Sequence, residues 1–218
     1  MKVCTDACLF GACISHHTSN YKKALDIGTG TGLLSLMFAQ KNNDGSIDAI
    51  EIDKDAYEQA IDNIELTEWR NKIRVYLDDI KTFHPSYKYD IIFSNPPFFI
   101  NDLKSNDSQR NIAMHSSLLS YAELIENVVR LLDSSGVFYV LIPFLNENIF
   151  IKTANEKLLY VNKIVRVKQT PNHYYFRSII SFSTNETKIS EEEIIIKETE
   201  DNYSRAFINL LSDYYLYL

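Results

Sequence analysis

The chain has 218 residues, of which 45% are hydrophobic and 23% charged, a balance that excludes disordered and collagen-like classes and favours one globular domain over residues 1–218. No apolar run approaches the roughly 18 residues that cross a bilayer, and no signal-peptide pattern opens the sequence, so we expect a cytoplasmic protein. The net charge of −7 argues against strong nonspecific binding to nucleic acid, but segment 185–201, with seven acidic and two basic residues, carries most of that charge.

Strands and helices alternate along the sequence in the pattern of an α/β protein. The predicted strands are 24–27, 47–50, 73–77, 89–94, 136–142, 161–168 and 174–182. The predicted helices are 33–41, 54–66, 120–132 and 146–159. Ser120 is the expected N-cap of the third of these helices, and Glu123 completes a capping box there.

The last two predicted strands are separated by Thr170-Pro171-Asn172, a turn signal that predicts a hairpin. The alternation before them predicts a doubly wound, mostly parallel sheet with helices on both faces. We therefore expect seven strands, with the antiparallel hairpin at the edge of the sheet. The polar tract 101–117 is the longest interruption and has the length of a binding loop.

A glycine-rich turn joins the first predicted strand to the first predicted helix. It reads Asp26-Ile27-Gly28-Thr29-Gly30-Thr31-Gly32. Glycines at such a turn permit positive φ and let the backbone approach a ligand, while free N–H groups at the helix start favour polar or anionic groups. The spacing G-x-G-x-G differs from the dinucleotide fingerprint G-x-G-x-x-G, so a nucleotide-type ligand other than NAD is the better interpretation. A purely structural turn is the alternative.

Acidic residues follow the next two strands. Glu51 ends the second strand and lies 19 residues after Gly32, where a carboxylate can accept hydrogen bonds from ribose hydroxyls. Asp53 competes for that role but is better placed to cap the following helix. Asp79, after the third strand, can accept a hydrogen bond from the exocyclic amine of an adenine. Asp78 is an alternative for this role, and a solvated acidic turn without a binding role is the other interpretation.

The tetrapeptide Asn95-Pro96-Pro97-Phe98 directly follows the fourth strand. Consecutive prolines lock φ and hold the chain in a stiff, extended path. The Asn95 side-chain oxygen and the Pro96 carbonyl could accept hydrogens from a planar –NH2 group, while Phe98 stacks on the attached ring. These residues are the predicted catalytic set, and simple loop stiffening is the alternative.

The order DIGTGTG, AIEID, LDDI and IIFSNPPFF resembles the class I methyltransferases that modify adenine N6 or glutamine N5. Within that group, MKVCTDACLFGA, the tract from QRNIAMHSS to FYVLIP, and LLSDYYLYL resemble the bacterial tRNA1(Val) adenine-37 N6-methyltransferase family. The chain departs from that family's pattern at Cys4, where a glycine is usual, and at Met114, where an arginine is usual.

The resemblance implies a Rossmann-like class I methyltransferase fold and S-adenosyl-L-methionine as cofactor. The residues implied to bind the cofactor are Asp26, Gly28, Gly30, Gly32, Glu51, Asp79, Thr5 and Asp6. Asn95, Pro96, Pro97 and Phe98 would hold the target base. Arg110 and His115 are expected to face the RNA.

Basic and aromatic residues also alternate on the predicted C-terminal hairpin. The basic residues are Lys163, Arg166, Lys168, His173 and Arg177, and the aromatic ones are Tyr174, Tyr175 and Phe176. Such a surface can hold a splayed RNA loop, with Arg177 among the substrate contacts; an edge hairpin with one solvated face is the alternative. Cys4, Cys8 and Cys13 lie on an expected amphipathic helix and lack the spacing of an iron–sulfur site, so we expect no metal.

The sequence thus predicts S-adenosylmethionine-dependent N6-methylation of an adenine in RNA, with adenine 37 of tRNA1(Val) as the most specific candidate. We expect a monomer whose substrate is tRNA, with direct methyl transfer and no covalent enzyme intermediate. The alternatives that keep the chemistry are N5-methylation of a release-factor glutamine and N6-methylation of adenine in ribosomal RNA or DNA. A noncatalytic cofactor-binding subunit is a rival from another class, and a nicotinamide dehydrogenase is disfavoured by the glycine spacing.

Overall fold

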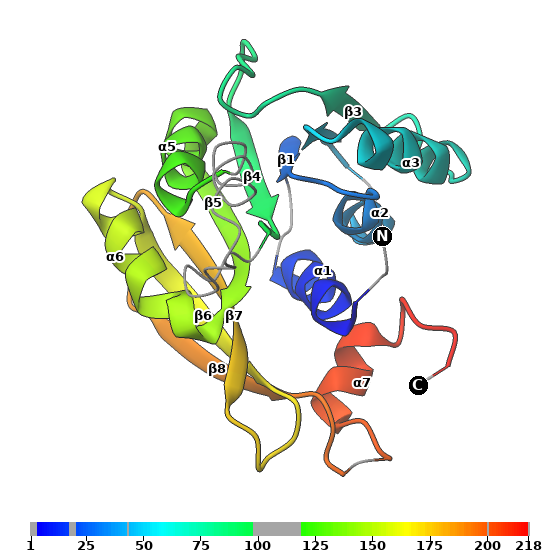
Figure 1. Ribbon diagram of the computed structural model, residues 1–218, viewed down its shortest axis with the longest axis vertical. Coiled ribbons are helices and arrows are strands. Elements are labelled where there is room, and N and C mark those ends of the chain that lie inside the picture. The colour runs from blue at the N-terminus through cyan, green and yellow to red at the C-terminus, as the bar shows by residue number, and fades with distance from the viewer. Residues whose placement is uncertain (1–3, 18–20, 43, 98–118, 200, 218) are drawn as a thin grey trace, which may run out of the picture.

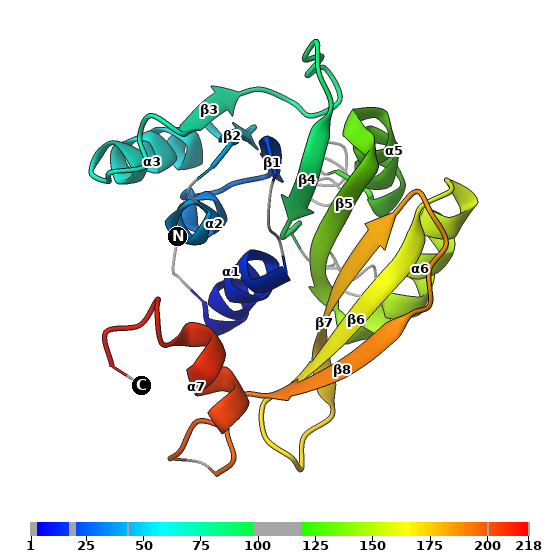
Figure 2. The ribbon, with the colours of Figure 1, turned by 180° about the vertical axis from the view of Figure 1, so that it is seen from behind.

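The computed structural model describes residues 4–17, 21–42, 44–97, 119–199 and 201–217, which build one sheet with helices on both faces (Figure 1, Figure 2). The strands are β1 Lys23–Ile27, β2 Ser46–Glu51, β3 Ile73–Leu77, β4 Tyr89–Ser94, β5 Leu132–Pro143, β6 Tyr160–Lys168, β7 Tyr175–Ser183 and β8 Ser190–Ile195. The helices are α1 Thr5–His17, α2 Leu33–Lys41, α3 Lys54–Glu65, α5 Tyr121–Leu131, α6 Glu147–Glu156 and α7 Arg205–Leu211, with a 3-10 turn η1 Phe144–Asn146.

The strand order is β3-β2-β1-β4-β5-β7-β6-β8. β1 pairs in parallel with both β2 and β4, so the chain changes direction across the sheet between β1 and β4. In doubly wound sheets, ligands bind outside the carboxyl ends of the strands at such a switch point. The predicted fold class is therefore confirmed, and the topology locates the site to look for.

Two details of the predicted sheet were wrong. The sheet has eight strands rather than seven, and the hairpin of β6 and β7 is not at its edge, because β7 lies between β5 and β6 and β8 pairs in parallel with β6. The sequence does not predict β8, because three consecutive glutamates are more typical of a solvated loop than of a strand. They are tolerated because each forms an ion pair with β6: Lys163 with Glu192, Arg166 with Glu191 and Lys168 with Glu193.

Two apolar layers hold the helices against the sheet. On one face, buried side chains of α1, α2 and α7 such as Phe10, Phe38 and Phe207 share a core. On the other face, Leu124 of α5 and Phe150 of α6 belong to a second core. Fully burying a side chain of this size contributes about 1.5–3 kcal/mol, so the helices that flank the switch point are firmly seated.

The start of α5 confirms the predicted capping box. The Ser120 hydroxyl accepts from the Glu123 backbone N–H at 3.2 Å, and the Glu123 carboxylate accepts from the Ser120 N–H at 2.8 Å. Within the described residues, no helix is long and apolar enough to cross a membrane, and no three His, Cys, Asp or Glu side chains are placed to share a metal ion.

Candidate active site

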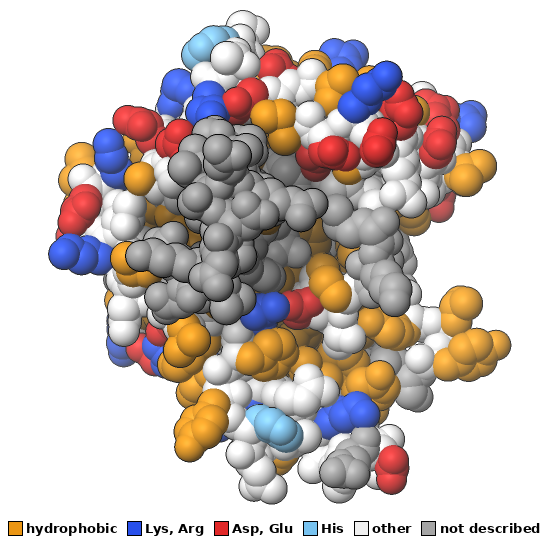
Figure 3. All heavy atoms as spheres, viewed as in Figure 1, with side chains coloured by type: hydrophobic (Ala, Val, Ile, Leu, Met, Phe, Trp, Pro, Cys, Tyr) orange, Lys and Arg blue, Asp and Glu red, His pale blue; other side chains and the backbone are white. Residues whose placement is uncertain are grey.

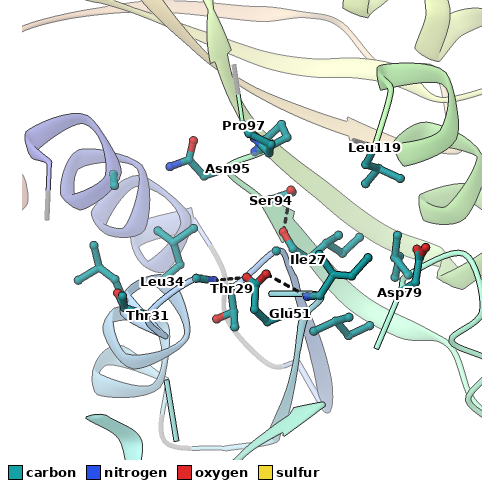
Figure 4. A pocket seen from close by; sticks show the side chains of 18 of the residues that line it. Ile27, Thr29, Thr31, Leu34, Glu51, Asp79, Ser94, Asn95, Pro97 and Leu119 are labelled. Atoms are coloured by element: carbon teal, nitrogen blue, oxygen red, sulfur yellow. Dashed lines mark hydrogen bonds between the residues drawn. The ribbon is translucent and has the colours of Figure 1, made fainter. Parts of the chain in front are cut away.

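A cavity of about 430 Å³ opens at the carboxyl ends of β1, β2 and β4 (Figure 4). Its volume lies within the range of small-molecule sites. The glycine turn, the ends of β2 and β3, the Asn-Pro-Pro segment and the first turns of α1 contribute to its wall. The topology thus brings together sequence motifs that lie up to about 90 residues apart.

The glycine turn presents bare backbone to this cavity. Gly28, Gly30 and Gly32 have φ of 72°, 59° and 82°, values that side-chain-bearing residues rarely adopt. Gly28 and Gly30 line the cavity, and a Cβ at Gly28 would meet no atom within 4 Å. Gly32 instead caps the start of α2 and lies against Ala60 and Ile64 of α3. Two of the three predicted glycines are therefore placed to contact a ligand directly.

Asp26 stabilises the glycine turn through hydrogen bonds but does not line the cavity. Its Oδ2 atom accepts hydrogen bonds from the hydroxyls of Thr29 and Ser35, each at 2.7 Å. Its Oδ1 atom is buried and has no hydrogen-bond partner among the described residues. Burial raises the pKa of Asp26 to about 6, and the negative charge of Glu51 acts in the same direction.

Glu51 holds the opposite side of the turn. Its Oε2 atom accepts from the Gly30 N–H at 2.8 Å, and its Oε1 atom accepts from the N–H groups of Ile52 and Asp53 at 2.9 Å. The carboxylate is therefore fixed at the cavity wall, as Figure 4 shows. Asp53, the alternative candidate for ribose binding, accepts from the Ala56 N–H at 2.8 Å as the N-cap of α3. Glu51 is therefore better placed to bind a ligand in the cavity.

Asp79 lies at the end of β3, with Lys81 beside it on the cavity wall. One Asp79 oxygen accepts from the Lys81 N–H at 2.9 Å, and the other lies 3.4 Å from the Lys81 ammonium. Asp78 also lines the cavity, but its carboxylate accepts from the Asp79 N–H and the Thr82 hydroxyl. Sequence reasoning missed Lys81, because a single lysine after a strand carries no local signal.

Asn95 follows β4 directly and faces the cavity with Pro96 and Pro97. The preceding Ser94 donates its hydroxyl to the Ile27 carbonyl at 2.8 Å, which ties this segment to the glycine turn (Figure 4). The Asn95 Oδ1 atom is buried without a hydrogen-bond partner among the described residues. A buried acceptor without a partner is costly, so this atom is a candidate acceptor for a donor group of a ligand. Phe98, Arg110 and His115 lie outside the described residues.

Thr5 and Asp6 sit behind the part of α1 that reaches the cavity. Cys4 and Ala7 line the wall, whereas Thr5 and Asp6 do not; Asp6 accepts from the Nε of Arg177 at 2.8 Å. Burial opposes ionisation of Asp6, but hydrogen bonds from Cys4 and Arg177 hold the pKa of its carboxyl below the ordinary value. Arg177, expected to face substrate, is thus engaged within the protein.

The other cations of the hairpin are also paired. Lys163 and Lys168 contact glutamates of β8 at 2.7 and 2.9 Å. Arg166 contacts Glu191 at 2.7 Å and the buried Glu147 at 2.6 Å. These three side chains are therefore paired with carboxylates of β8 and α6, which favours the alternative interpretation of the hairpin as an ordinary pair of strands with one solvated face.

Comparisons with known proteins agree with this geometry. The family model described as the methyltransferase small domain matches residues 8–146. A solved structure of a predicted O-methyltransferase from Agrobacterium tumefaciens aligns with a TM-score of 0.73 over 95% of both chains at 13% identity, and a putative RNA methyltransferase from Pyrococcus horikoshii aligns with 0.58 over 80% of both at 20%. The fold and the cavity at its switch point therefore define a class I methyltransferase.

Curated relatives place the chain more narrowly. A protein of Pseudoalteromonas translucida is 41% identical over 99% of this chain and 92% of its own length, and one of Flavobacterium psychrophilum is 40% identical over 99% and 93%. Both are named tRNA1(Val) (adenine(37)-N6)-methyltransferase. The chain belongs to the tRNA1(Val) (adenine(37)-N6)-methyltransferase family.

Proposed function

We propose that the protein methylates N6 of an adenine in RNA, with adenine 37 of tRNA1(Val) as its target and S-adenosyl-L-methionine as methyl donor. The observation that carries the proposal is the buried Oδ1 atom of Asn95, which has no hydrogen-bond partner among the described residues. Asn95 lines the same cavity as the glycine turn and Glu51. An exocyclic amine donates the hydrogen bond that this oxygen lacks. The names of the relatives identify which amine to test first.

The cavity suits an adenosine-containing cofactor. Glu51 offers carboxylate oxygens to ribose hydroxyls, and Asp79 offers an acceptor to the adenine amine. Gly28 leaves room for close approach of the ligand to the backbone, and Gly30 lines the same wall. When bound, S-adenosylmethionine supplies an electrophilic methyl group on a sulfonium.

The residues of this chain contribute orientation. Pro96 and Pro97 fix the path after β4, so that the Asn95 oxygen and the Pro96 carbonyl accept the two hydrogens of one amino group. Binding both hydrogens directs the nitrogen lone pair toward the cofactor side of the cavity, a proximity and orientation effect. The displaced proton leaves to solvent. The target base must be unstacked to reach Asn95, which an anticodon loop permits.

The test is incubation with labelled S-adenosylmethionine and separate samples of unmodified tRNA, ribosomal RNA, DNA and release factor. We expect label in tRNA as N6-methyladenosine. Label in the release factor would keep the chemistry and replace the substrate. Asn95→Ala should lower turnover at least about 100-fold while calorimetry shows unchanged affinity for S-adenosylhomocysteine, and Asn95→Asp, which keeps an acceptor, should retain more activity than Asn95→Ala.

A further inference from the structure

Beside the proposed active site, four apolar side chains form a rim. Phe144 and Leu145 follow β5, Tyr174 precedes β7 and Tyr175 begins it; we call these four residues the aromatic rim. Tyr174 is 94% exposed and Leu145 87% exposed. Exposed apolar side chains grouped in this way mark interaction sites.

The rim lies further along the strand direction than Asn95, beyond the carboxyl end of β4. On neighbouring strands Ser94 of β4 is aligned with Val140 of β5, and β5 continues three residues further to Pro143, which pairs with Arg177 of β7. Three strand residues span about 10 Å, so the rim lies beyond Ser94 at the carboxyl end of β4 and β5, the end of the sheet that carries Asn95. Figure 3 shows hydrophobic side chains gathered below the grey atoms, over the region where the lower ends of β5, β6 and β7 lie in Figure 1.

Ring contacts hold the base of the rim in place. The rings of Phe144 and Tyr175 have centroids 5.2 Å apart, and the Lys168 ammonium lies 4.6 Å from the Tyr175 ring centroid. The Tyr175 hydroxyl donates to Glu193 at 2.6 Å. Tyr174 therefore projects from a supported backbone, which lowers the entropy cost of using it as a contact.

The charges of the hairpin decide the kind of contact. Arg166 and Lys168, which flank the rim, form ion pairs with glutamates. Their charges are therefore compensated within the protein, which disfavours phosphate binding at this surface. Nucleotides that adjoin a flipped base expose their π-faces, and aromatic side chains stack on them without needing charge. The chemistry of the rim therefore matches RNA bases rather than RNA phosphates.

We infer that the aromatic rim stacks on bases next to the target adenine and positions the RNA loop over Asn95. This inference rests on the proposed function. It predicts that the rim contributes to RNA affinity through stacking at Tyr174, with Leu145 as an apolar neighbour. Cofactor affinity should not depend on it.

The experiment measures the dissociation constant of an unmodified tRNA1(Val) anticodon stem–loop with S-adenosylhomocysteine present. Tyr174→Ala should raise it about tenfold, Tyr174→Trp should restore wild-type binding, and Tyr174→Leu should remain weak. Leu66→Ala is the matched control, because Leu66 is 88% exposed but lies just after α3, at the amino end of the sheet. The slope of affinity against salt should be the same in Tyr174→Ala and wild type, since no phosphate contact is lost.

The inference is overturned if Tyr174→Ala binds as tightly as Leu66→Ala, or if Tyr174→Leu binds as tightly as wild type. Failure of the proposed function looks different: the wild-type protein would bind S-adenosylhomocysteine but neither bind nor methylate any tRNA. Circular dichroism and unchanged cofactor affinity confirm that each variant is folded.

Discussion

The Nε of Arg177 donates to Asp6 across 2.8 Å, joining residues 171 positions apart in the sequence. Asp6 belongs to the first turn of α1, whose neighbours Cys4 and Ala7 line the cavity. Arg177 lies on β7, paired with Pro143 at the end of β5. This ion pair therefore connects the N-terminal helix to the strands beside the aromatic rim, and so connects the proposed cofactor-binding side of the cavity to the proposed RNA-binding side.

Arg177→Met should weaken both folding and cofactor binding. Loss of a largely buried, charge-assisted hydrogen bond should lower the free energy of unfolding by about 1–2 kcal/mol at pH 7 and raise the dissociation constant of S-adenosylhomocysteine several-fold. Because the pKa of Asp6 is held below its ordinary value, this stabilisation is present above about pH 4 and is lost as pH falls through the folded-state value.

Urea unfolding at pH 7 and at pH 3 measures that difference. The exposed arginine Arg205 provides the control, since Arg205→Met should leave cofactor binding unchanged. If Arg177→Met were destabilising by the same amount at both pH values, the ion pair would not be the cause.

Glu51 and Asp53 can be separated by a pair of substitutions. Glu51→Ala removes the acceptor of three backbone N–H groups on the cavity wall, so affinity for S-adenosylhomocysteine should fall more than tenfold. Asp53→Ala removes only the N-cap of α3 and should cost about 1 kcal/mol of stability with unchanged affinity. Calorimetry and thermal unfolding measure both. Equal loss of affinity in the two variants would contradict the assignment of Glu51.

Local patterns predicted much of the fold. Strand 73–77 and strand 89–94 match β3 and β4, and the capping box at Ser120 starts α5 as expected. β5 begins at Leu132 instead of Gly136, because Leu132 pairs with Tyr89 across an irregular register. Such pairing depends on a neighbouring strand and leaves no mark in the local sequence.

The site also contains features that local sequence predicts and features that depend on long-range contacts. Glu51 and Asn95 follow buried strands within short motifs, so their positions could be predicted from spacing alone. The fate of Arg166 could not, because its partners Glu147 and Glu191 lie 19 and 25 residues away in the chain. Charge compensation of this kind is a property of the tertiary structure. A basic pattern in a sequence therefore predicts an RNA surface only when no acidic strand lies against it.

Asp26 should make stability depend on pH in the reverse sense to Asp6. Its pKa is raised to about 6 by burial, so the folded protein holds the proton more tightly than the unfolded chain. The resulting penalty, at most about 3 kcal/mol, is fully present above pH 6 and disappears as pH falls toward 4. Relative to Asp26→Asn, the wild type should gain stability over that interval, as measured by urea unfolding at pH 4 and pH 7. A constant difference between the two proteins would contradict this account.

The ion pair between Arg166 and Glu147 should be the strongest of the hairpin. Glu147 is buried, receives hydrogen bonds from the Nε and Nη2 of Arg166 and from the Ser178 hydroxyl at 2.6–3.0 Å, and directly follows η1, which carries Phe144 and Leu145 of the rim. Arg166→Met leaves that carboxylate without its cation and should cost about 3–5 kcal/mol.

Glu191→Gln tests the exposed partner of the same arginine and should cost at most about 1 kcal/mol. Because Glu147 anchors the turn that supports the rim, we expect Arg166→Met to weaken RNA binding as well, whereas Glu191→Gln should not. Chemical unfolding and stem–loop binding of both variants measure this. A small stability cost for Arg166→Met together with weakened RNA binding would instead mean that the arginine touches RNA directly.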